Sequence, residues 1–157
     1  AWRLAEIPVL PMRYSDYARA AAGYIDSAEA HAGSDRPIKL LATRAAAARW
    51  EAAAIRLENR LAHGPVAPAV ARAVNDKLMQ VERALVEPTG QHGRPFIRHL
   101  LVAPQPSYRS AYLPRIWDAI DRNDRGAVPA HEAEIVAAFD RAAEILRQAT
   151  ALLDAGP

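Results

Sequence analysis

Cysteine is absent from this sequence, and long uncharged runs are absent as well. Without cysteine, the chain forms no disulfide, no thiolate nucleophile and no cysteine-based zinc site. No run of about 18 residues escapes charge, so the sequence predicts no membrane-spanning helix. The formal net charge is only +2, from 20 basic and 18 acidic residues. This surplus is too small to predict a nucleic-acid-binding protein.

Alanine is the most abundant residue, and all but two of the 20 basic residues are arginine. Both residue types favour helices. An apolar fraction of 51% with a low net charge excludes intrinsic disorder. The length of 157 residues suits a single domain, and we expect residues 1–157 to form it. The sequence begins at Ala1 without an initiator methionine, so we expect a piece of a longer protein.

Apolar residues recur at three- and four-residue spacing in four long segments, which predicts four amphipathic helices. No segment has a convincing strand pattern, so the predicted fold class is all-α. The expected architecture is a four-helix bundle with a long, proline-rich, packed excursion and a short helix between the third and fourth long helices. The expected long helices span residues 15–32, 42–63, 66–86 and 130–154, and the short helix spans 113–123.

The excursion, residues 87–114, is unlike the rest of the chain. It contains five prolines and two glycines, interleaved with apolar residues such as Ile97 and Leu101. A connection of this length inside a compact domain is usually functional. We therefore expect it to pack against the bundle and to carry a role of its own.

Histidine is the first residue type to test for metal binding or acid–base chemistry. No two of the five histidines lie three or four residues apart, and His131-Glu132 lacks the second histidine of a zinc-protease helix. No nucleophile elbow, phosphate loop or dinucleotide-binding glycine pattern is present. His99, beside Arg98 in the excursion, suits either a structural hydrogen bond or a role at an interface. We therefore predict no catalytic residue and no metal ligand in this chain.

Three motifs follow one another along the second half of the chain. They are NDKLMQVERA at residues 75–84, RPFIRH at 94–99 and LPRIWDAI at 113–120. The pair Ala103-Pro104 lies between the second and the third. In order and approximate spacing, this succession resembles the C-terminal helical domain of the glutamate carboxypeptidase and transferrin receptor family of zinc metallopeptidases, and the likeness covers nearly the whole chain.

The resemblance implies a domain that makes most of the contact in a homodimer and packs on a peptidase domain of the same protein. Two zinc ions and the catalytic glutamate are then expected in that peptidase domain, which this chain lacks. The resemblance also implies that the excursion reaches the substrate pocket, where Tyr108 matches a substrate-binding tyrosine. The family's lysine position holds Ser107, and the neighbouring Arg109 is a candidate for supplying the charge. The residues expected at an interface or in a structural role are Arg94, Arg98, His99 and Trp117.

Two alternatives remain open at the level of the sequence. The parent protein could be a non-enzymatic binding protein similar to transferrin receptor, or the chain could be an unrelated four-helix bundle. Trp117 could anchor an interface or lie in the core of the domain. The alanine- and arginine-rich composition suggests a bacterium with GC-rich DNA, which favours a working peptidase.

Overall fold

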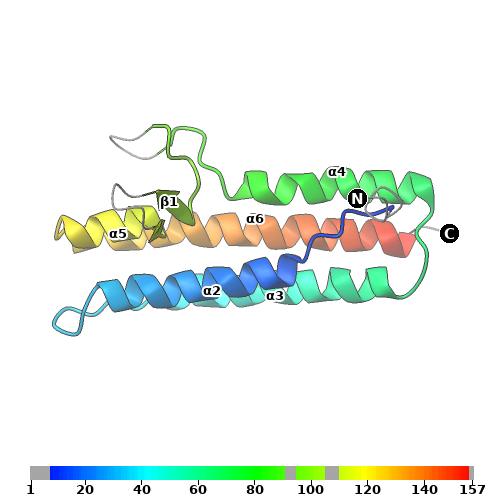
Figure 1. Cartoon of the computed structure of the whole chain (residues 1–157). Helices are drawn as coiled ribbons and strands as arrows, with labels where there is room; N and C mark the ends of the chain where they lie inside the picture. The colour runs from blue at the N-terminus through cyan, green and yellow to red at the C-terminus, as the bar shows by residue number, and fades with distance from the viewer. Residues whose placement is uncertain (1–7, 91–94, 105–109, 156–157) are drawn as a thin grey trace.

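The computed structural model describes residues 8–90, 95–104 and 110–155 (Figure 1). The four long helices predicted from the sequence are present, with ends that differ by a few residues. The third begins at Pro68 rather than Val66, because proline is favoured at the start of a helix. The long helices are α2 (Tyr14–His31), α3 (Leu41–Ala62), α4 (Pro68–Ala84) and α6 (Val128–Ala155), and the short helix is α5 (Pro114–Asp121). A single 3-10 turn, η1 (Arg125–Ala127), separates α5 from α6.

The helices are layered around α6, which lies between α4 on one side and the α2–α3 pair on the other (Figure 1). Small residues make this close packing possible. On α3 the buried face includes Ala46 and Ala54, and on α6 it includes Ala138 and Ala142. The many alanines therefore favour helix formation and also allow the helices to approach one another closely.

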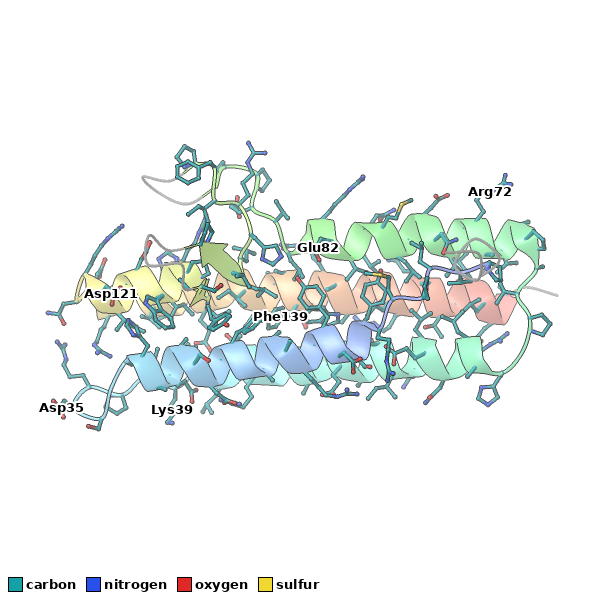
Figure 2. All side chains as sticks on the ribbon, in the orientation of Figure 1. Asp35, Lys39, Arg72, Glu82, Asp121 and Phe139 are labelled. Carbon is teal, nitrogen blue, oxygen red and sulfur yellow. The ribbon has the colours of Figure 1, made fainter. Side chains whose placement is uncertain are left out.

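Three aromatic rings form the centre of the core. Trp50 of α3 is fully buried, with its ring centroid 5.1 Å from that of Tyr17 on α2 and 5.3 Å from that of Phe139 on α6. Phe139 lies between α6 and the α2–α3 pair (Figure 2). These contacts join α2, α3 and α6, so the core is continuous across the three helices.

The excursion contains two short strands that the sequence analysis did not predict. β1 (Val102–Pro104) pairs antiparallel with β2 (Ser110–Tyr112), with Ala103 opposite Ala111. Three residues are too few to show a period-two pattern, and the pairing depends on a partner elsewhere in the chain. The excursion is packed as expected, since Ile97, Leu100, Leu101, Ala103 and Ala111 are all buried.

None of the helices in the described part of the chain is long and apolar enough to cross a membrane.

Candidate functional site

His99, near the middle of the excursion, fastens it to α2 and α4. The Leu101 N–H donates to His99 Nδ1 at 3.1 Å. In a neutral ring the proton therefore lies on Nε2, which is 3.0 Å from Glu82 Oε1 and 3.1 Å from the Tyr17 hydroxyl. Glu82 is at the end of α4 that is nearest the excursion (Figure 2). These contacts give His99 structural hydrogen bonds, and its role at an interface stays a prediction.

Two tyrosines of α2 are held in their neutral form beside this cluster. Burial, assisted by the negative charge of Glu82, raises the pKa of Tyr14 to about 12. The same two causes, together with a hydrogen bond to Glu82, raise the pKa of Tyr17. The Tyr14 hydroxyl donates to the Leu78 carbonyl at 2.9 Å, which ties α2 to α4. At neutral pH both phenols therefore remain hydrogen-bonding groups without charge.

Gly90 forms the first tight turn of the excursion. Its φ is +69°, and a Cβ at this position would collide with the Pro95 carbonyl. The Gly90 carbonyl accepts a hydrogen bond from Arg115 Nη2 at 2.8 Å, and Arg115 Nη1 pairs with Glu134 at 2.6 Å. Arg115 thus links the turn to α5 and α6, a role that its place in the sequence did not indicate.

Tyr112 of β2 stacks on Tyr24 of α2, with ring centroids 4.4 Å apart and planes 7° from parallel. This stack holds the second strand against the bundle. The Leu113 N–H, directly after β2, donates to the Leu101 carbonyl at 2.9 Å. The end of the strand pair at Val102 and Tyr112 is therefore fixed to the bundle.

Trp117 lies on α5 and makes contacts within the domain. Its ring stacks on His31 with centroids 3.8 Å apart, and His31 Nε2 lies 2.6 Å from Asp121 Oδ1. His31, the last residue of α2, therefore lies between α2 and α5. Trp117 is half-buried, so these contacts leave its part in an interface as a prediction.

Of the remaining predicted site residues, the structure describes one and leaves three outside the described ranges. Arg98 is exposed, next to buried Ile97 and two residues from Phe96, which is 78% exposed. Arg94, Tyr108 and Arg109 lie outside the described residues. Residues 105–109 connect β1 to β2, so the strand pair brings the two ends of the segment containing Tyr108 together.

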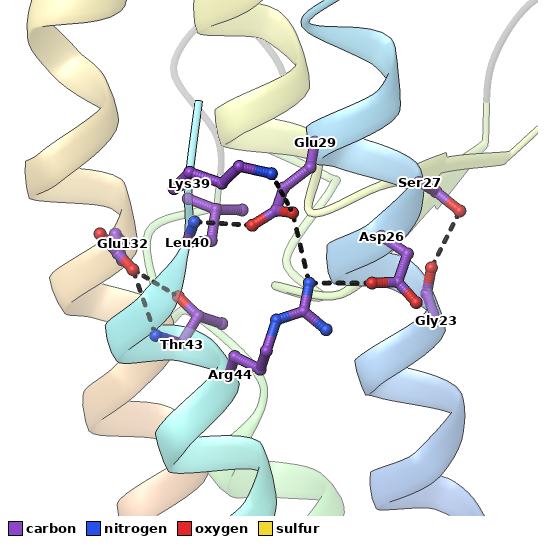
Figure 3. A network of polar contacts seen from close by, with 9 residues as sticks. All are labelled: Gly23, Asp26, Ser27, Glu29, Lys39, Leu40, Thr43, Arg44 and Glu132. Carbon is purple, nitrogen blue, oxygen red and sulfur yellow. Dashed lines mark hydrogen bonds and ion pairs between the residues drawn. The ribbon is translucent and has the colours of Figure 1, made fainter. Parts of the chain in front are cut away.

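A separate polar network fixes the connection between α2 and α3 (Figure 3). Arg44 bonds to Asp26 at 2.8 Å and to Glu29 at 3.3 Å, and the Leu40 N–H donates to Glu29 at 2.9 Å. Burial on its own would raise the pKa of Glu29, but this hydrogen bond and the charges of Lys39 and Arg44 lower it. The start of α3 is thereby held by charged partners from α2.

Across the described residues, no group of three or more histidine, aspartate or glutamate side chains is placed to hold a metal ion. The prediction of two zinc ions concerns a peptidase domain outside this chain and stays a prediction.

Comparison with known proteins gives one family and several plant relatives. Probable glutamate carboxypeptidase VP8 of Zea mays is 29% identical, over 94% of this chain and 23% of the relative. Probable glutamate carboxypeptidase AMP1 of Arabidopsis thaliana is 29% identical, over 92% of this chain and 22% of the relative. Probable glutamate carboxypeptidase LAMP1, also of Arabidopsis thaliana, is 31% identical over 77% of this chain. The bacterial source suggested by composition stays a prediction.

The chain spans between a fifth and a quarter of the length of the first two of these relatives. Residues 38–153 match the family described as the transferrin receptor-like dimerisation domain. The match contains α3, α4, the excursion, α5 and nearly all of α6. The chain therefore belongs to the transferrin receptor-like dimerisation domain family, as the three sequence motifs predicted.

Proposed function

We propose that this chain is the homodimerisation domain of a glutamate carboxypeptidase-like zinc exopeptidase and that its excursion contributes to the substrate pocket. The chain is not catalytic by itself in this proposal. The observation that carries it is the family match over residues 38–153, together with relatives named as probable glutamate carboxypeptidases. The two zinc ions and the hydrolytic chemistry belong to a peptidase domain outside this chain.

The contacts between the excursion and the helices support a role in positioning a substrate-binding side chain. His99, Gly90 and Tyr112 each contact a helix, so the excursion is anchored to the bundle at three points. Anchoring of this kind suits a loop that must hold a substrate-binding side chain within a fraction of an ångström. In the sequence, Tyr108 and Arg109 lie between β1 and β2, whose residues Pro104 and Ser110 are paired. We assign Tyr108 a hydrogen bond to substrate and Arg109 the charge that attracts its carboxylate.

Kinetics of the intact parent protein test the pocket contribution. Tyr108→Phe removes one hydrogen bond to a charged group, which is worth about 1.5–3 kcal/mol, or about 10- to 150-fold in kcat/KM. Tyr112→Phe is the matched control, because it keeps the stack on Tyr24. Unchanged kcat/KM in the Tyr108 variant would show that this residue does not bind substrate.

Measuring the zinc content of the intact parent protein tests whether that protein is a zinc exopeptidase. A zinc exopeptidase is expected to bind about two zinc ions per chain and to lose hydrolysis when a chelator removes them. A parent without bound zinc and without hydrolysis would instead be a binding protein similar to transferrin receptor.

Sedimentation of the chain alone tests homodimerisation. We expect a reversible monomer–dimer equilibrium as the concentration rises. A monomer at every concentration would contradict the proposal that this domain is sufficient for pairing.

A further inference from the structure

The outward face of α3 carries an uncharged apolar ridge. We define the outer ridge as Leu41, Ala45, Ala48, Ala52 and Ile55, all of which are exposed. Leu41 is 68% exposed and Ile55 is 40% exposed, and both are among the few large apolar side chains that the described residues leave open to solvent. Their spacing of four, three, four and three residues is that of a seam between two helices.

The ridge has no partner within the described chain. The opposite side of α3 is buried through residues such as Trp50 and Leu57, which pack against the bundle. Three of the charged side chains beside the ridge are already paired. Arg44 bonds to Asp26 and Glu29 (Figure 3), Glu51 bonds to Arg19, and Arg49 bonds to Asp140 through two nitrogens. Covering the ridge therefore buries apolar surface without leaving these charges unpaired.

The order of residues along the ridge suits a second copy of the same chain. A two-fold contact is self-complementary, so each residue meets its counterpart across the axis. With two α3 helices antiparallel and the axis near Ala48, Leu41 of one copy faces Ile55 of the other, and Ala45 faces Ala52. Large side chains then meet at both ends, and small ones allow close approach in the middle. The same register brings Arg44 of each copy toward Glu51 of the other, which adds attraction.

We propose that the outer ridge of α3 is the two-fold contact of the homodimer, formed by antiparallel packing of α3 against α3 of a second copy. This inference rests on the proposed function, because it names the surface that performs the dimerisation. The family match, which contains the whole of α3, supports a second copy as the occupant. A stable interface buries at least about 1,000 Å², so the ridge forms its centre and the exposed sides of neighbouring helices form its rim.

Cysteine crosslinking tests the contact directly, because the natural chain contains no cysteine. A disulfide requires Cα atoms within about 7 Å, so only residues that meet across the axis are joined. We expect Ala48→Cys to form a covalent dimer on mild oxidation. Leu41→Cys and Ile55→Cys are expected to crosslink when mixed, and neither on its own. The control is Ala69→Cys on α4, which lies on the far side of α6 (Figure 1) and is expected to stay monomeric in denaturing gels.

Charge substitution gives a second, independent measurement. Ala48→Glu is expected to weaken dimerisation at least tenfold in sedimentation, whereas Ala69→Glu leaves it unchanged, and circular dichroism verifies that both variants remain helical. A dimer in which Ala48→Cys does not crosslink and Ala48→Glu has no effect would overturn the ridge contact and leave homodimerisation intact. Self-crosslinking of Leu41→Cys would overturn the antiparallel arrangement. A natural chain that is monomeric at every concentration would overturn both proposals.

Discussion

Tyr14 shows how burial changes the chemistry of a single residue. Its side chain is 6% exposed, and its hydroxyl donates to the Leu78 carbonyl of another helix. Because an ionised phenol is costly in this environment, the neutral form is favoured in the folded protein. The pKa is raised to about 12 in the folded state, against about 10 in the unfolded chain.

This difference predicts a loss of stability at alkaline pH. A raised folded-state pKa contributes stability that is fully present below the unfolded pKa and is lost as the pH rises through the folded pKa. Between about pH 10 and pH 12, the Tyr14 contribution to the free energy of unfolding is expected to fall by about 2–3 kcal/mol. Urea unfolding across this range measures it. The Tyr14→Phe variant should show a shallower decline, and an equal decline would contradict the assignment.

His99 is the second residue whose surroundings define its role. Its Nδ1 satisfies the backbone N–H of Leu101, a residue that is fully buried. Replacing His99 by alanine leaves that N–H without its partner, which costs about 1–3 kcal/mol. We expect the free energy of unfolding in urea to fall by this amount.

His63 provides the control for this prediction. It is exposed, and its side chain bonds to the Asn59 carbonyl of the preceding helix. His63→Ala is therefore expected to change the free energy of unfolding by no more than about 0.5 kcal/mol. Equal effects in the two histidine variants would show that the contacts of His99 do not stabilise the excursion.

At the scale of elements, the excursion is built by contacts between segments that are distant in sequence. The Leu100 N–H donates to the Leu85 carbonyl, and the Glu87 N–H donates to the Arg98 carbonyl. Farther along the excursion, β1 pairs with β2. In the described part of this proline- and glycine-rich segment, backbone groups thus pair with one another and with the bundle.

Gly90 allows a direct test of that shape. Gly90→Ala places a Cβ against the Pro95 carbonyl and also strains the positive φ, so we expect a loss of more than about 2 kcal/mol in unfolding free energy. Gly33 is the matched control, with φ +76° and open space around its Cα. Gly33→Ala is expected to cost only the backbone strain of about 1–2 kcal/mol. Equal losses would indicate that the turn at Gly90 differs from the one described.

At the scale of the whole molecule, α6 is the element on which the bundle depends. It packs against α3 and α4, and its Phe139 contacts Trp50 in the centre of the core. Phe139 is fully buried, so removing its ring leaves a cavity where three helices meet. Such a cavity lowers the stability of the whole domain, because a close-packed core cannot rearrange locally to fill it.

Phe139→Ala is expected to lower the free energy of unfolding by about 3–5 kcal/mol. Met79→Ala on α4 is the control, because Met79 is 52% exposed and its loss should change stability by no more than about 0.5 kcal/mol. Chemical denaturation followed by circular dichroism measures both variants. A small effect of Phe139→Ala would contradict a core centred on these aromatic rings.

Much of the fold and the family follows from local features of the sequence. Apolar spacing located the four long helices because one face of each must be buried, as on α3, where Trp50, Ala54 and Leu57 are buried. Proline and glycine marked the excursion. The three motifs identified the family before any contact was known, since motif order is a property of the chain itself.

The tertiary structure alone decided which distant residues meet. His99 contacts Tyr17 of α2 and Glu82 of α4, Tyr112 stacks on Tyr24, and β1 pairs with β2. It also left Leu41 and Ile55 exposed on α3, where an apolar residue is otherwise expected to be buried. Such outcomes depend on how whole helices pack, because side chains separated by tens of residues become neighbours only through three-dimensional packing, which local periodicity does not encode.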